Sequence, residues 1–265
     1  MTVSVGDETY THGVPPCVGR GVSWTQSELQ TAISDQVAVI VYDDEGTADI
    51  EDLLLGVAET EFEQQKLADV LQDTDTVENW RVGEAVAETY LTDHRSCTFP
   101  WPDGRDARKR TASLPGADLV GFQLDSTGIR FAFGEVKTSG EKKYPPQAMH
   151  GRTGLKQQIE DLRDREDIRD DLLKYLGHRA GTAAWKERYQ AASKRYLSNS
   201  ADVQLFGILV RDVDPNTEDL RVRVEKLAKN CPKGTSIELM ALYLPGGAIE
   251  KLATMALTAH EGADS

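Results

Sequence analysis

Hydrophobic residues recur along the chain at two spacings, one typical of buried strands and one typical of amphipathic helices. Short apolar runs rich in β-branched residues predict strands at 36–42, 203–210 and 237–244. Spacings of three and four residues predict helices over 49–71, 77–92, 153–176, 183–197 and 218–229. Strands and helices mixed in this way are typical of an α/β protein.

Two further apolar segments, 116–124 and 129–137, are joined by Asp125-Ser126-Thr127-Gly128. So short a connection, rich in turn-forming residues, predicts an antiparallel hairpin. The segment 96–113 that precedes the hairpin is rich in Pro, Gly and charge and has no apolar periodicity, which predicts an exposed loop.

Negative charge is concentrated in the first third of the chain. Residues 1–80 hold 17 Asp and Glu against 2 Lys and Arg, whereas residues 81–265 hold 27 against 28. The formal net charge of -14 therefore does not exclude nucleic-acid binding by the later part. We divide the chain into an acidic α+β amino-terminal region at 1–76, a core at 77–258 and a disordered tail at 259–265.

Several function classes lack their sequence signatures. No apolar run approaches the roughly 20 residues of a membrane span, so we expect a cytoplasmic protein without a membrane partner. Three widely spaced cysteines without a CxxC pair support neither a disulfide framework nor a thiolate zinc site. The chain also lacks a Gly-rich phosphate loop, a GxSxG elbow and an HExxH motif.

The candidate chemistry lies on the predicted hairpin. Glu135 and Lys137 alternate with Val136 and therefore project from the same side of one strand, while Asp118 lies early on the other strand. Two carboxylates beside a lysine at the end of apolar strands are costly to bury unless a cation offsets their charge. The alternative is that Glu135 and Lys137 lie on the exposed face of an edge strand and that Asp118 is a turn residue.

The order of these features resembles a known superfamily. Residues 83–91 (GEAVAETYL), 116–122 (GADLVGF) and 131–139 (FAFGEVKTS) resemble the PD-(D/E)XK nucleases, although Gly116-Ala117 replaces the Pro that usually opens the motif. The resemblance implies a restriction-endonuclease-like core of α-β-β-β-α-β order, in which helices flank a mixed sheet. It implies that Asp118, Glu135 and Glu84 bind Mg²⁺ or Mn²⁺ and that Lys137 assists catalysis.

Some assignments stay open. Glu88 competes with Glu84 because both lie on one helix face, and Gln157 or Gln158 is a candidate for the supporting glutamine of RecB-like members. Phosphate contacts are expected from cations near the hairpin, namely Arg105, Arg108, Lys109, Arg110, Lys142, Lys143, Arg152 and Lys156. More distant cations, such as Lys194 and Arg195, are expected to be solvated surface residues.

The implied function is hydrolysis of DNA phosphodiester bonds. The chain also looks similar to nuclease subunits of bacterial antiphage systems such as the Hachiman type, which implies a helicase partner that controls the activity. The acidic region would then restrain or dock the nuclease. Two alternatives are a sequence-specific restriction endonuclease and a nuclease-like module that binds nucleic acid without cutting it.

Overall fold

The computed structural model describes residues 2–71, 77–102, 105 and 116–263. The strands are β1 (Asp7–Val14), β2 (Cys17–Ser23), β3 (Cys97–Thr98), β4 (Leu119–Asp125), β5 (Gly128–Ser139), β6 (Val203–Arg211) and β7 (Ser236–Tyr243). The helices are α1 (Gln26–Ala32), α2 (Ala38–Tyr42), α3 (Asp44–Leu55), α4 (Glu61–Leu71), α5 (Asn79–Arg95), α6 (Leu155–Asp164), α7 (Glu166–Ala180), α8 (Lys186–Ser198), α9 (Arg221–Ala228) and α10 (Leu252–Ala263). Shorter turns are the π-helical η1 (Ile33–Val37) and the 3-10 turns η3 (Gln147–Met149), η4 (Thr217–Asp219) and η5 (Ile249–Lys251).

The strands form one mixed sheet in the order β1-β2-β7-β6-β5-β4-β3. Strands β2, β7, β6 and β5 run parallel, whereas β1, β4 and β3 pair in antiparallel fashion. Every residue of β6 is buried, which confirms the prediction of a central strand over 203–210. The sheet with its flanking helices makes this an α/β protein.

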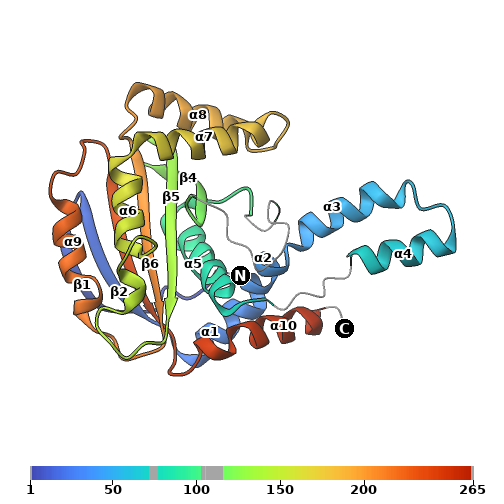
Figure 1. Cartoon of the computed structure of the whole chain (residues 1–265), viewed down its shortest axis with the longest axis horizontal. Helices are drawn as coiled ribbons and strands as arrows, with labels where there is room; N and C mark the ends of the chain where they lie inside the picture. The colour runs from blue at the N-terminus through green and yellow to red at the C-terminus, as the bar shows by residue number, and fades with distance from the viewer. Residues whose placement is uncertain (1, 72–76, 103–104, 106–115, 264–265) are drawn as a thin grey trace.

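Helices cover both faces of the sheet (Figure 1). On one face α1, α5 and α10 share an apolar core that includes Leu29, Val86 and Leu252. On the other face α6, α7, α8 and α9 share a second core that includes Ile159 and Leu176. Between α5 and β6 the chain order is α-β-β-β-α-β, with two additional helices inserted before β6.

The predicted hairpin is confirmed. Asp125 pairs with Gly128, so that Ser126 and Thr127 form a two-residue turn. The Asp125 carboxylate accepts hydrogen bonds from the backbone and hydroxyl of Thr127, both at 2.7 Å, which fixes the turn.

The strand predicted at 36–42 is wrong, because this segment is helical and spans part of η1 and all of α2. Leu29, Ile33 and Val37 are buried at intervals of four residues, and this helical period begins upstream of the apolar run. The run packs beside α5 and α10 instead of joining the sheet.

Two long predicted helices are each divided. The segment 49–71 holds the end of α3 and all of α4, which a turn near Gly56 separates, and 153–176 is divided at Arg165 between α6 and α7. Helices α3 and α4 form an arm that extends away from the sheet (Figure 1). The helices predicted at 77–92, 183–197 and 218–229 correspond to α5, α8 and α9, the last preceded by η4.

The amino-terminal region contributes directly to the sheet, because β1 and β2 continue it beyond β7. These strands were not predicted. The disordered tail is also wrong over residues 259–263, where α10 continues to Ala263 and Ala259 packs against the core. In the part of the chain that the structure describes, no helix is both long and apolar enough to cross a membrane.

Candidate active site

Asp118 lies where β4 and β5 separate. The ladder ends at the pair Leu119 and Gly134, so the next two residues would be Asp118 and Glu135. In place of a ladder bond, Asp118 Oδ2 accepts a hydrogen bond from the backbone N–H of Val136 at 2.8 Å. The two-residue turn at the other end of the hairpin sets this register, and the register brings the two carboxylates together.

Lys137 connects the two acids. Its Nζ forms an ion pair with Glu135 Oε1 and lies 3.9 Å from Asp118 Oδ2. The Glu135 side chain is 1% exposed and that of Asp118 is 11% exposed, whereas the Lys137 side chain remains 25% exposed. A single ammonium therefore faces two carboxylates in a poorly hydrated position.

The excess negative charge is reflected in the protonation of these groups. Burial and the neighbouring Asp118 carboxylate raise the pKa of Glu135 to about 9, although the Lys137 ammonium opposes this shift. Burial disfavours the charged form of Lys137, but the Glu135 and Asp118 carboxylates outweigh this effect and raise its pKa, with Glu84 acting in the same direction. Glu135 Oε2 is buried and accepts no hydrogen bond from any described residue.

Glu84 approaches from α5. A side chain at Gly83 would place its Cβ 2.2 Å from Thr138 Oγ1, so only glycine allows α5 to pack this closely on β5. Glu84 forms an ion pair with Arg81 at 3.2 Å. A cavity of about 50 Å³ is lined by Glu84, Glu88 and Asp118 together, so both competing glutamates face the Asp118 segment.

The amino-terminal region also reaches this cavity, which sequence reasoning missed. Asp43, at the junction of α2 and α3, lines it and pairs with Arg105 at 2.8 Å. Asp43 has a φ of 48° and its side chain caps α3 by accepting from the Gly46 N–H. The sequence around Asp43 indicates a turn or a helix cap and nothing more. The contact with Arg105 joins residues 62 positions apart, so local sequence does not predict it.

The residues present fit a divalent cation in part. Among the described residues, no group of three or more His, Cys, Asp or Glu side chains has an arrangement that could hold a metal ion. Within the described part of the chain, Asp118 and Glu135 converge at Lys137, and Glu135 Oε2 accepts no hydrogen bond. Mg²⁺ is commonly held by one or two carboxylates and several waters, so this pair provides suitable protein ligands, with Glu84 nearby.

The predicted phosphate-binding residues have different environments. Lys142, Lys143 and Arg152 are exposed, whereas Lys156 pairs with Glu160 at 3.3 Å. Arg105 is largely covered, with 16% of its side chain exposed, and lies against Asp43 and the Trp101 ring. Arg108, Lys109 and Arg110 lie outside the described residues.

The two candidate glutamines differ. Gln157 donates a hydrogen bond to Asp161 Oδ1 at 2.9 Å. Gln158 lines a larger cavity with Gly116 and Ala117, next to Asp118, and its Oε1 is buried with no hydrogen-bond partner among the described residues. Gln158 is thus the glutamine that faces the Asp118 segment.

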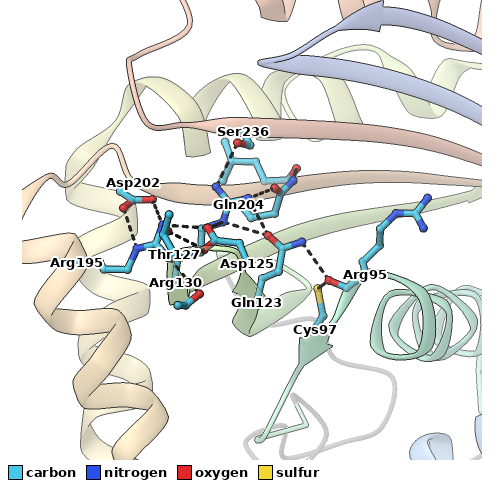
Figure 2. Close-up of polar contacts among 12 residues, drawn as sticks. Arg95, Cys97, Gln123, Asp125, Thr127, Arg130, Arg195, Asp202, Gln204 and Ser236 are labelled. Atoms are coloured by element: carbon cyan, nitrogen blue, oxygen red, sulfur yellow. Dashed lines mark hydrogen bonds and ion pairs between the residues drawn. The ribbon is translucent and has the colours of Figure 1, made fainter.

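A second charged cluster lies at the turn end of the same hairpin (Figure 2). Arg195 of α8, expected to be a solvated surface residue, instead bonds Asp125 at 3.0 Å and Asp202 at 2.8 Å. Arg130 donates to Gln123 at 2.8 Å and to Gln204 at 2.7 Å. We call Gln123, Asp125, Arg130, Arg195, Asp202 and Gln204 the turn network.

Comparison with known proteins gives no family assignment, because no family model matches the chain and a search of curated proteins finds no match. The functional argument therefore depends on the geometry of Asp118, Glu135 and Lys137.

Proposed function

We propose that this protein is a metal-dependent nuclease of the PD-(D/E)XK type that hydrolyses DNA phosphodiester bonds. The observation that carries the proposal is the convergence of Asp118, Glu135 and Lys137 where β4 and β5 separate, with a buried carboxylate oxygen that accepts no hydrogen bond from the described residues. The α-β-β-β-α-β order that holds these residues agrees with a restriction-endonuclease-like core.

Each residue has a role in this proposal. Asp118 and Glu135 hold Mg²⁺ or Mn²⁺, and Glu84 supplies a third carboxylate from α5. When bound, the metal ion activates a water for attack on phosphorus and stabilises the negative charge that develops there. Lys137, between the carboxylates, donates a hydrogen bond to the attacking water or the scissile phosphate. The exposed Lys142, Lys143 and Arg152 contact neighbouring phosphates.

The decisive test is cleavage of supercoiled, linear and single-stranded DNA with Mg²⁺ or Mn²⁺. The wild type is expected to cut, and EDTA or the double variant Glu135→Gln/Lys137→Met to abolish cutting. The matched control is Glu166→Gln/Lys174→Met, which makes the same chemical changes at exposed positions on α7. Equal cutting by both double variants would overturn the proposed site.

The same assay separates the alternatives. Discrete fragments cut at one short sequence would identify a restriction endonuclease. DNA binding without cutting, with every metal and with a helicase present, would identify a silent nuclease-like module. The first result would keep the nuclease and add sequence specificity, whereas the second would contradict catalysis.

We also propose that a partner protein, such as the helicase of an antiphage system, docks on the arm formed by α3 and α4. Ile50, Leu53, Val57 and Phe62 are 51–81% exposed, an unusual set of apolar side chains for a surface that meets only water. Residues 46–69 carry seven acidic residues and one basic residue, so a partner with basic residues around an apolar groove would complement them.

This partnership is tested by titrating a fluorescently labelled full chain with the candidate helicase. The double variant Leu53→Ser/Phe62→Ser is expected to weaken binding about 100-fold, as for the loss of two buried anchors. Leu197→Ser, an 83% exposed leucine on α8, is the matched control. If neither variant changes the affinity, the arm is not the docking surface.

A further inference from the structure

A cavity of about 500 Å³ opens between helices α6 and α7 and the segment that leads to Asp118 and β4. Gly116 and Ala117 form part of its wall, and Asp118 is the next residue in the chain. Consecutive Cα atoms are about 3.8 Å apart, so a group bound against Ala117 lies next to the Asp118 backbone, while the Asp118 side chain lines the smaller cavity with Glu84. The cavity lies on the face of the sheet opposite α5.

The lining of the cavity is mostly apolar. Val120 contributes from β4, Leu162 from α6, and Leu172 and the Tyr175 ring from α7. The Tyr175 ring is held in place by the Arg179 guanidinium, which lies 3.9 Å from its centre. These walls suit a flat, uncharged ring.

The polar groups of the cavity narrow the choice of ligand. Asp161, Asp171 and Arg152 line it, so its charged side chains together carry one net negative charge. Gln158 offers an amide whose Oε1 is buried and has no hydrogen-bond partner among the described residues. An uncharged ring with an edge N–H would satisfy this amide once the Gln158 side chain turns into the cavity, whereas an anion would meet two carboxylates against one guanidinium.

We propose that this cavity binds an unstacked nucleobase of the substrate, while the adjoining phosphate lies at Asp118 and Glu135. The inference depends on the proposed nuclease function and refines it to a substrate class. A base inside a duplex must be unstacked at a cost of a few kcal/mol before it can enter such a cavity. Single strands and frayed ends are therefore the preferred substrates.

The test measures binding of a fluorescent single-stranded DNA to the full chain in Ca²⁺, and repeats it with one abasic residue at each successive position. One abasic position is expected to weaken wild-type binding on the order of ten-fold, because one base contact contributes ~1–3 kcal/mol. Gln158→Leu and Leu172→Trp should weaken binding of the intact strand to a similar extent. Neither variant should then lose further affinity when the abasic residue is introduced, because removing the base and altering the cavity abolish the same contact.

Gln190→Leu, an exposed glutamine on α8, is the matched control and should bind as the wild type does. If no abasic position matters, or if its effect persists in both cavity variants, the cavity does not hold a base. Failure of the nuclease proposal looks different, because the wild type would then cut no DNA with Mg²⁺ or Mn²⁺. Two variants are used because Leu172→Trp alters a buried position and can fail to fold, whereas Gln158→Leu changes little volume.

Discussion

The two ends of the β4–β5 hairpin carry charged clusters of opposite character. In the turn network two arginines face two aspartates and two glutamines, and Arg195 and Arg130 donate to their oxygens at 2.7–3.0 Å (Figure 2). At the other end one lysine faces two carboxylates, and Glu135 Oε2 has no partner among the described residues. The first cluster is balanced, whereas the second has a surplus of negative charge whenever both of its carboxylates are ionised.

The pKa values of the carboxyl groups differ between the two clusters in the same way. Burial alone would raise the pKa of Asp125, but hydrogen bonds from Arg195 and Thr127 hold it well below its usual range. Burial and Asp118 raise the pKa of Glu135 to about 9 despite Lys137. The turn network therefore stabilises the fold, while the Asp118 end carries a cost that a bound cation would offset.

The largest expected effect of a single substitution at neutral pH comes from breaking the turn network. Arg195→Met leaves Asp125 and Asp202 without their main partner and should lower the free energy of unfolding by about 3 kcal/mol. Urea denaturation measures this loss. Lys194→Met, at the neighbouring exposed position of the same helix, should stay within about 0.5 kcal/mol of the wild type. A loss below that control value would mean that the network does not stabilise the protein.

Metal ions should stabilise the protein through the Asp118 end of the hairpin and not through the turn network. At a concentration 100 times its dissociation constant, Mn²⁺ should raise the free energy of unfolding of the wild type by about 2.7 kcal/mol. Glu135→Gln should abolish this rise, whereas Arg195→Met should retain it although it lowers stability overall. The measurement is thermal unfolding with and without Mn²⁺, which requires no catalytic activity. An equal rise in Glu135→Gln would show that the metal ion binds elsewhere.

The pH dependence of stability should have opposite signs for the two clusters. Because the folded pKa of Glu135 is about 9, above its ordinary 4.5, its contribution is complete below pH 4.5 and is lost as the pH rises towards 9. The slope is at most about 1.4 kcal/mol per pH unit. The contribution of Asp125, whose pKa is lowered, is present above pH 3.8 and lost in stronger acid.

Denaturation in metal-free buffers at pH 3, 5, 7 and 9 measures both contributions. Glu135→Gln should reduce the fall in the free energy of unfolding between pH 5 and 9. It should leave the loss of stability in acid unchanged. Asp125→Asn should do the reverse. If Glu135→Gln keeps the wild-type slope in the neutral and alkaline range, another group causes that slope.

The sequence predicts the centre of the fold better than its periphery. β6 is a dense apolar run, and the hairpin has both apolar strands and a turn that determines its register, so that Asp118 faces Glu135. β1 lies mostly exposed at the sheet edge, and its polar sequence carries little strand signal. The segment 36–42 is apolar enough for a strand, but it continues a helical period that begins at Leu29 and it packs against α5 and α10.

The same limit applies to the charged clusters. Alternation within β5 places Glu135 and Lys137 on one side, so this pair could be predicted from local spacing. Arg195 contacts Asp125 across 70 positions, and Asp43 contacts Arg105 across 62. Such contacts depend on how the helices dock on the sheet. The hydrophobic periodicity of the sequence does not predict this docking.

The smallest expected effect tests the close approach of α5 at the Asp118 end. In an open helix, Gly→Ala stabilises by about 1 kcal/mol. At Gly83 the added Cβ would lie 2.2 Å from Thr138 Oγ1, so α5 or the Thr138 side chain must shift and the sign should reverse to a loss of about 1 kcal/mol. Because Glu84 moves with this helix, cutting by Gly83→Ala should also fall.

Thr138→Ala provides the matched rescue. Thr138 Oγ1 is buried without a hydrogen-bond partner in the described part of the chain, so its removal breaks no hydrogen bond that the structure shows. The double variant Gly83→Ala/Thr138→Ala should therefore be more stable than Gly83→Ala alone and should recover its cutting rate. Urea denaturation and DNA cleavage of the four proteins give the coupling between the two positions. Additive effects would mean that the 2.2 Å approach does not control where α5 places Glu84.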